Sequence, residues 1–81
     1  MPSTNPQRVE IASIPKGKRA EIRIASQEYR GVTVIDIRVW HRSKTAQDNA
    51  AMQPTQRGIT MTPVRAATLA KALARASKPY I

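Results

Sequence analysis

The chain has 81 residues, enough for one domain with one modest core. It has no Cys and one His, which excludes disulfides, thiolate nucleophiles and a metal site built from His and Cys. Lys and Arg number 14 against 5 Asp and Glu, so the net charge of +9 indicates a polyanionic partner, first nucleic acid and second an anionic membrane surface. No apolar run approaches the roughly 20 residues of a membrane span and no signal peptide pattern is present, so we expect a cytoplasmic, nucleoid-associated protein.

The first part of the chain predicts a tail followed by strands. Residues 1–8 are polar with two prolines and are expected to form a flexible tail. Residues 9–14 tolerate a strand, residues 15–18 resemble a turn, and residues 19–26 alternate apolar and polar side chains as a half-buried strand does. Residues 27–31 are expected to connect this strand to the next, with Gly31 able to take a positive φ.

Residues 32–42 (VTVIDIRVWHR) give the strongest strand signal, being rich in β-branched residues and free of Gly and Pro. Alternation places Ile35, Ile37 and Val39 on an apolar face, which we expect to be the core. The opposite face carries Arg38 and Trp40 and is expected to meet solvent or a ligand. Residues 43–54 are expected to form a flexible loop. Residues 55–61 predict a short strand whose glycine marks a bulge or a close backbone approach.

The end of the chain predicts a helix over residues 64–77. Thr62 fits the N-cap, Pro63 fits the first helical position, and Leu69 and Leu73 fall on one apolar stripe. Strands followed by a helix predict an α+β fold, residues 9–78, in which the helix covers one face of an antiparallel sheet. Because one sheet and one helix leave much of the stripe uncovered, we expect a homodimer with Leu69 and Leu73 in its interface.

The sequence offers little for catalysis. Its five acids are not spaced as a two-carboxylate site, its three glycines form no phosphate-binding loop, and no nucleophile motif accompanies its single histidine. We therefore expect a binding protein that is not an enzyme and that uses no cofactor and no metal.

Basic and aromatic residues are placed as single-stranded nucleic acid requires, because cations track phosphates while rings stack on exposed bases. A duplex hides its bases, and this sheet has no basic helix to place in the major groove. Each residue also has a structural alternative: Arg38 can pair with Asp36 or Glu21, and Trp40 can fill a dimer interface or a satellite cluster. The candidates are Lys16, Lys18, Arg23, Tyr29, Arg30, Arg38, Trp40 and Arg57.

Two blocks, residues 29–40 (YRGVTVIDIRVW) and 54–61 (PTQRGITM), resemble in order and spacing the signatures of the positive-cofactor-four transcriptional coactivator family. The resemblance extends over roughly residues 9–77. It implies a four-stranded curved antiparallel sheet with a C-terminal helix and a dimer formed largely through the helices. It also implies single-stranded DNA binding on the curved sheet surfaces, with melted or unpaired duplex also bound. Tyr29 then matches the family's stacking aromatic, Arg38 its strand arginine, and Arg57 the basic residue before the Gly-Ile block. Lys16 and Lys18 fall near the family's basic turn that leads into the second strand.

The chain departs from this pattern at two places. Where the coactivator has two adjacent aromatics, this chain has Trp40 and His41, so the second stacking role falls to His41, or to Trp40 through a local bulge. Where a basic residue often follows the glycine, this chain has Val32. Without a long acidic, Ser-rich segment, it looks like the short prokaryotic or phage-type members.

The sequence thus predicts a homodimer that binds single-stranded DNA with low sequence specificity. Its role would be that of a transcription coactivator or regulator, with the transcription machinery as a further partner, or DNA maintenance. The alternatives are a protein-interaction module and an RNA-binding protein that uses the same basic sheet.

Overall fold

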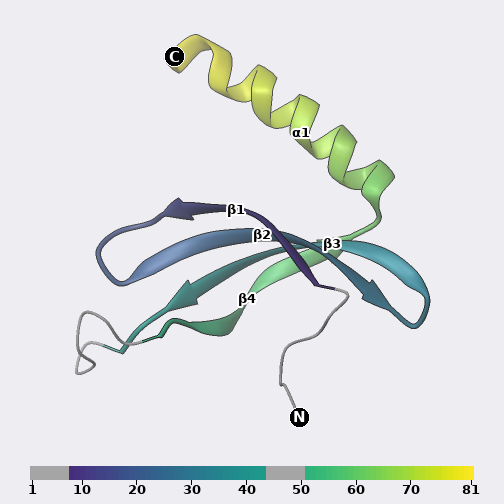
Figure 1. Ribbon diagram of the computed structural model, residues 1–81. Helices are drawn as coiled ribbons and strands as arrows, with labels where there is room; N and C mark the ends of the chain where they lie inside the picture. Colours follow the sequence, from purple (N-terminus) through teal and green to yellow (C-terminus); the bar gives the residue numbers. More distant parts are fainter. Residues whose placement is uncertain (1–7, 44–50) are drawn as a thin grey trace.

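The computed structural model describes residues 8–43 and 51–81, so most of the predicted tail and part of the predicted 43–54 loop lie outside the described residues. The described chain forms β1 (Val9–Pro15), β2 (Ala20–Tyr29), β3 (Val32–His41), β4 (Gln53–Met61), α1 (Pro63–Ser77) and the short 3₁₀ helix η1 (Lys78–Tyr80). The strands pair antiparallel in the order β1-β2-β3-β4 and form an open, curved sheet (Figure 1). The predicted α+β architecture, a four-stranded antiparallel sheet followed by one helix, is confirmed.

Two strand boundaries differ from the prediction because pairing extends the strands. β2 continues through Tyr29, since its last residues pair with the start of β3, and only Arg30 and Gly31 remain as the turn. Both have positive φ, 53° and 79°, which is the two-residue hairpin geometry that suits twisted strands. β4 begins at Gln53, inside the predicted loop, because Gln53 and Pro54 pair with the end of β3.

Gly58 marks the closest approach of β4 to β3. A Cβ atom at this position would lie 2.6 Å from the carbonyl oxygen of Ile37 and 2.9 Å from the Cα atom of Arg38. The register shifts between Arg38 and Trp40, just beside this glycine. The bulge or close approach predicted for this strand is therefore confirmed, and only glycine fits without displacing β3.

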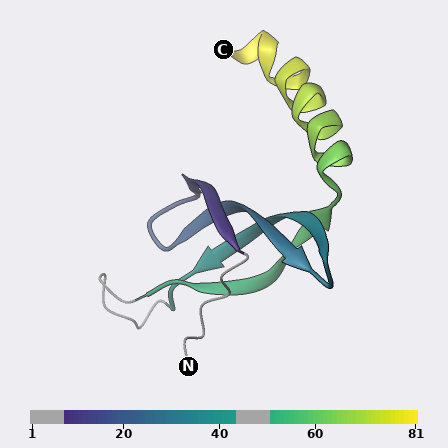
Figure 2. The same cartoon turned by 45° about the vertical axis from the view of Figure 1, so that its right-hand side comes forward.

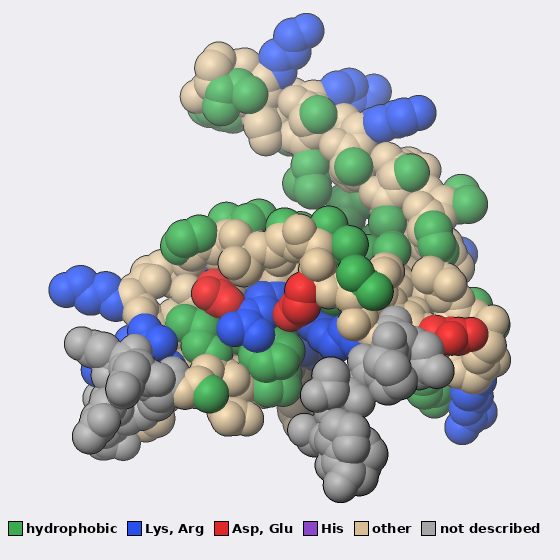
Figure 3. Space-filling view, viewed as in Figure 1, with side chains coloured by type: hydrophobic (Ala, Val, Ile, Leu, Met, Phe, Trp, Pro, Cys, Tyr) green, Lys and Arg blue, Asp and Glu red, His purple; other side chains and the backbone are tan. Residues whose placement is uncertain are grey.

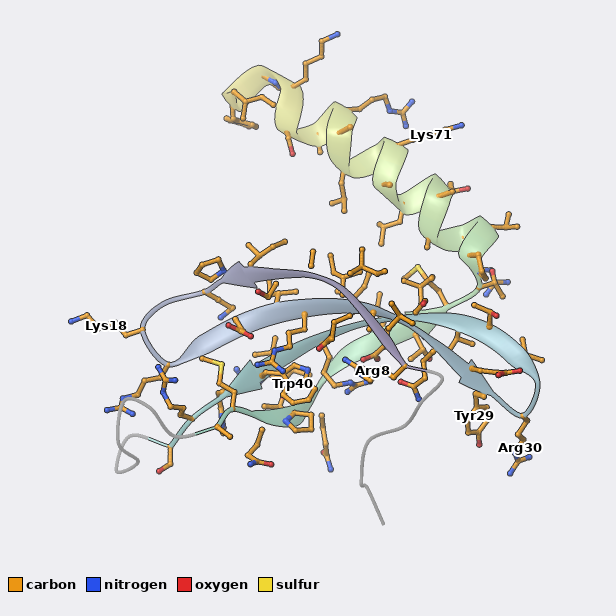
Figure 4. The ribbon with its side chains drawn as sticks, viewed as in Figure 1. Arg8, Lys18, Tyr29, Arg30, Trp40 and Lys71 are labelled. Atoms are coloured by element: carbon orange, nitrogen blue, oxygen red, sulfur yellow. The ribbon has the colours of Figure 1, made fainter. Side chains whose placement is uncertain are left out.

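The two faces of the sheet differ in chemistry. On the side of α1, Ile22 pairs with Val39, and Ile37 pairs with both Ile24 and Ile59; we call this side the apolar face. The opposite side, called the polar face, is made by cross-strand pairs of Arg23 with Arg38, Glu21 with Trp40 and Ala25 with Asp36. Figure 4 shows Trp40 and Tyr29 on this second side, away from the helix.

The helix does not cover the apolar face within one chain, contrary to the sequence prediction. α1 begins as predicted, with the Thr62 hydroxyl accepting a hydrogen bond from the Arg65 backbone N–H, but then rises away from the sheet (Figures 1 and 2). No residue of α1 is buried, and Leu73 is 56% exposed. The two buried residues of the described chain, Ala25 and Asp36, lie on the polar face. The expected core is therefore an open surface in the single chain.

Among the described residues, no helix is long and apolar enough to cross a bilayer.

Candidate nucleic-acid interface

The centre of the polar face is held by hydrogen bonds to one buried carboxylate. Asp36 is 4% exposed and lies between two guanidinium groups. Arg38 donates to its Oδ1 atom from Nε (3.2 Å) and Nη2 (3.0 Å), and from Nη1 to the carbonyl oxygen of Thr55 on β4 (2.9 Å). Arg8 donates to Oδ2 (3.3 Å) and also to the side chain of Gln27 (3.0 Å). These contacts connect β2, β3 and β4 with the residue preceding β1.

A second group of charges continues this cluster toward β1. Arg23 pairs with Glu21 on its own strand and lies 3.8 Å from the carboxylate of Glu10, which also pairs with Arg8 at 3.3 Å. We call these three arginines and three carboxylates the arginine–carboxylate network: Arg8, Arg23, Arg38, Glu10, Glu21 and Asp36. Because positive and negative groups are equal in number, the network leaves the middle of the polar face without net charge.

Trp40 packs against this network and is half-buried. The guanidinium carbon of Arg23 lies 4.2 Å from the centroid of the indole ring, and that of Arg8 lies 5.6 Å from it, both within cation–π range. The indole Nε1 is buried and has no hydrogen-bond partner within the described part of the chain. The only Trp of the protein is thus already engaged by two cations.

An exposed aromatic residue marks one end of the sheet. Tyr29, the last residue of β2, is 57% exposed, and the guanidinium of Arg30 lies 5.3 Å from its ring centroid. In Figure 4 both side chains project from the β2–β3 turn on the side of the polar face. We call this pair the hairpin tip. It offers a ring for stacking beside a cation for a phosphate.

The other end of the sheet gathers cations around a hollow. Lys16, His41 and Arg57 line a hollow of about 430 Å³ on the side of the apolar face. Lys16 and His41 also line an adjoining hollow of about 400 Å³ with Arg19 and Arg42. With Lys18, which projects from the β1–β2 turn (Figure 4), these residues form what we call the basic end. Its members are Lys16, Lys18, Arg19, His41, Arg42 and Arg57.

Two arginines of the basic end also brace its backbone. Arg19 donates to the carbonyl oxygen of Ser43 (2.7 Å), and Arg42 donates to that of Lys18 (3.1 Å). In contrast, the side chains of Lys16, Lys18 and Arg57 make no ion pair with any described residue. On the sheet, the cations that remain available to a ligand therefore stand at this end and at the hairpin tip, and not in the middle.

The structure divides the predicted site residues into three groups. Arg23, Arg38 and Trp40 belong to the network or pack on it, Tyr29 and Arg30 form the hairpin tip, and Lys16, Lys18, His41 and Arg57 belong to the basic end. Sequence reasoning missed Arg8, which falls in the predicted tail and carries no local signal. No three His, Cys, Asp or Glu side chains of the described ranges gather as a metal site.

An open antiparallel sheet with a C-terminal helix and a cluster of cations at its basic end has the form of a small nucleic-acid-binding module. A family model described as Transcriptional Coactivator p15 (PC4) matches residues 15–72, and the chain belongs to this family. The resemblance seen in the sequence is therefore confirmed.

Solved structures agree with this assignment. The chain is similar to a PC4 homologue from Burkholderia pseudomallei, a bacterial member, with 28% identity in both of two crystal forms. In the tetragonal form the TM-score is 0.73, over 86% of this chain and 97% of that chain. In the orthorhombic form it is 0.75, over 93% and 96%. No curated protein sequence matches the chain.

Proposed function

We propose that the protein is a homodimer that binds single-stranded DNA with little sequence preference and acts by binding, without catalysis or cofactor. Its role would be that of a coactivator-like regulator of transcription, or DNA maintenance, in the cytoplasm at the nucleoid. The observation that carries the proposal is the distribution of charge. Three cations that make no ion pair with a described residue, Lys16, Lys18 and Arg57, stand at the basic end. An exposed ring stands at the hairpin tip, and the polar face between the two ends is neutral and partly aromatic.

This arrangement suits an extended single strand. Each ten-residue strand spans about 33 Å, so a polynucleotide running along β2 and β3 meets both ends of the sheet. Tyr29 then stacks on a base at the polar face. At the other end the strand turns around the edge of the sheet, where its phosphates contact Lys18, Lys16 and Arg57, the last two of which line the hollow on the side of the apolar face. A second stacking ring is supplied by His41, which is exposed and lines both hollows of the basic end.

The network residues have a different part in this proposal. Arg23 and Arg38 hold the floor of the interface, and each reaches a phosphate only by giving up part of its contact with a carboxylate. Trp40 packs beneath them, with its ring engaged by Arg8 and Arg23. The engagement of this indole is what favours His41 over Trp40 for the second stacking role.

The apolar surface of the single chain supports the homodimer. In the described part of the chain, α1 buries none of its residues, and large apolar side chains stay exposed on the helix and on the apolar face of the sheet. Ile59 (53% exposed) on the apolar face and Leu73 (56% exposed) on α1 are the residues that a partner copy would cover.

The test is fluorescence anisotropy with labelled oligo-dT, its duplex and the matching RNA, each over a series of salt concentrations. The logarithm of the oligo-dT affinity should fall linearly with the logarithm of salt, with a slope of about 0.7 per neutralised phosphate. In the variant Lys16→Gln/Arg57→Gln the slope should drop by about 1.4. Absent or salt-independent oligo-dT binding would favour the protein-interaction alternative, and tighter binding of the RNA would favour an RNA-binding protein.

A further inference from the structure

The outer side of α1 carries a row of cations that the sheet interface does not use. Lys71 and Arg75 of α1 are followed by Lys78, the C-cap of α1 and first residue of η1. Residues 62–81 contain no Asp or Glu. At 3.6 residues per turn, these three positions lie about half a turn away from Leu69 and Leu73. We call them the cation row. Figure 3 shows that the basic side chains along the upper part of the helix point away from the sheet, and Figure 4 labels Lys71 on that side.

The fold does not account for the whole row. The negative end of the helix dipole favours Arg75 and Lys78, which stand at the C-terminal end of the helix, but not Lys71 in its middle. Like charges four residues apart, as in Lys71 and Arg75, destabilise a helix. None of the three makes an ion pair with a described residue. On the sheet, by contrast, acidic side chains accompany the basic ones (Figure 3).

Dimerisation would leave the row open. A partner copy that covers the apolar stripe of α1 leaves the opposite side of the helix in solvent. In the proposed homodimer two such rows would therefore be exposed, outside the surfaces that bind single strands.

We propose that the cation row binds the phosphate backbone of duplex DNA. The row places three cations within about 11 Å along the helix axis, and a duplex carries one negative charge per about 1.7 Å of its own axis. The row contains no aromatic side chain, so it lacks the stacking contribution that single-strand binding uses. A duplex hides its bases and presents its phosphates, and the row offers contacts to phosphates alone. This site goes beyond the proposed function in both its ligand and its face.

The consequence is a protein that holds two forms of DNA at once. The sheet would take an unpaired strand while the helix row holds an adjoining paired segment. The second contact would raise the apparent affinity for a molecule that contains both, through effective concentration.

The experiment compares two triple variants of the full-length chain that lose the same charge. Lys71→Gln/Arg75→Gln/Lys78→Gln removes the cation row, and Lys16→Gln/Lys18→Gln/Arg57→Gln removes three cations of the basic end. Each is titrated against a blunt-ended duplex and against oligo-dT over a salt series, after circular dichroism has confirmed the fold. Because Gln is a good helix former, the row variant is expected to fold. The charge-preserving variant Lys71→Arg/Lys78→Arg serves as a further control.

The row variant should lose duplex affinity, and its salt slope for the duplex should fall by about 2.7, equivalent to about 40-fold over a fourfold change in salt. Its oligo-dT affinity should stay near wild type. The basic-end variant should show the larger loss for oligo-dT, and the Lys-to-Arg variant should bind the duplex normally. The proposal is overturned if the row variant binds the duplex as wild type does, or if both triple variants weaken both ligands equally.

Binding of the same variants to vesicles of phosphatidylglycerol and phosphatidylcholine tests whether the cation row contacts a membrane surface instead. If the row variant loses vesicle binding but retains duplex binding, the row is a membrane contact and the proposal is wrong. Failure of the proposed function would appear separately, as an absence of oligo-dT binding in the wild-type protein.

Discussion

Substitution of the buried carboxylate tests the network most directly. Asp36→Asn keeps the size of the side chain but removes the charge that two arginines share. In the structure this carboxylate accepts three hydrogen bonds, two from Arg38 at 3.0 and 3.2 Å and one from Arg8 at 3.3 Å. We expect the free energy of unfolding to fall and the oligo-dT affinity to rise, because both guanidinium groups are released.

The size of the stability loss follows from burial. Breaking a buried ion pair costs about 3–5 kcal/mol. Here the arginine side chains remain 21% and 24% exposed, so they can turn toward water when the carboxylate is lost. The expected loss is therefore about 2–3 kcal/mol, near the contribution of one charged hydrogen bond and below the fully buried case. For 81 residues, whose total stability is about 4–12 kcal/mol, this is a large fraction.

Urea denaturation, followed by the fluorescence of the single Trp and by circular dichroism at fixed protein concentration, measures the loss. Glu28→Gln is the matched control, because Glu28 is exposed and pairs with no described cation, and it should change stability by less than about 0.5 kcal/mol. The double variant Asp36→Asn/Arg38→Gln should lose less than the sum of its single variants. An Asp36→Asn protein as stable as Glu28→Gln would refute the view that this carboxylate holds the polar face together.

In the same variant Asp36→Asn, the affinity for oligo-dT is expected to rise while the stability falls. If Arg8 and Arg38 lie along the path of the single strand, their release should steepen the salt slope by about 0.7 for each phosphate gained. An unchanged slope would restrict both arginines to a structural role.

Local signals in the sequence predict most of the fold. Alternation identifies β2 and β3 and places Arg23, Arg38 and Trp40 on one face, which the cross-strand pairs confirm. The Thr62-Pro63 pair fixes the start of the helix. The ends of the strands are harder to predict, because the polar residues at the end of β2 and the start of β4 become strand only by pairing with β3.

The organisation of the site depends on contacts that no local pattern encodes. The sequence suggests Asp36 or Glu21 as partners for Arg38, and the structure selects Asp36, but Arg8 meets this carboxylate across 28 positions of the chain. Alternation assigns the core to the apolar face, yet the buried residues lie on the polar face. The alternation of apolar and polar residues shows which surface must be covered, but it does not show whether the same chain or a second copy covers it.

Three further outcomes test the assembly, the sheet and the stacking residues. Leu73→Asp should give a monomeric mass in light scattering, whereas wild type and the control Thr68→Asp, on the other side of α1, should give a dimer. A dimeric Leu73→Asp protein would show that this leucine is not part of the interface. Gly58→Ala should lower the free energy of unfolding by about 1–3 kcal/mol, because its Cβ atom would meet the backbone of β3, and wild-type stability would contradict that close approach. Trp40 emission should change little when oligo-dT binds, because guanidinium groups already engage the indole, and Trp40→Ala should reduce stability more than affinity. Tyr29→Ala should instead weaken oligo-dT binding by about 1–3 kcal/mol, the range for one base–aromatic stack, at unchanged stability. Strong quenching of the indole, together with a Tyr29→Ala variant that binds oligo-dT as wild type does, would indicate that bases stack in the middle of the sheet and not at the hairpin tip.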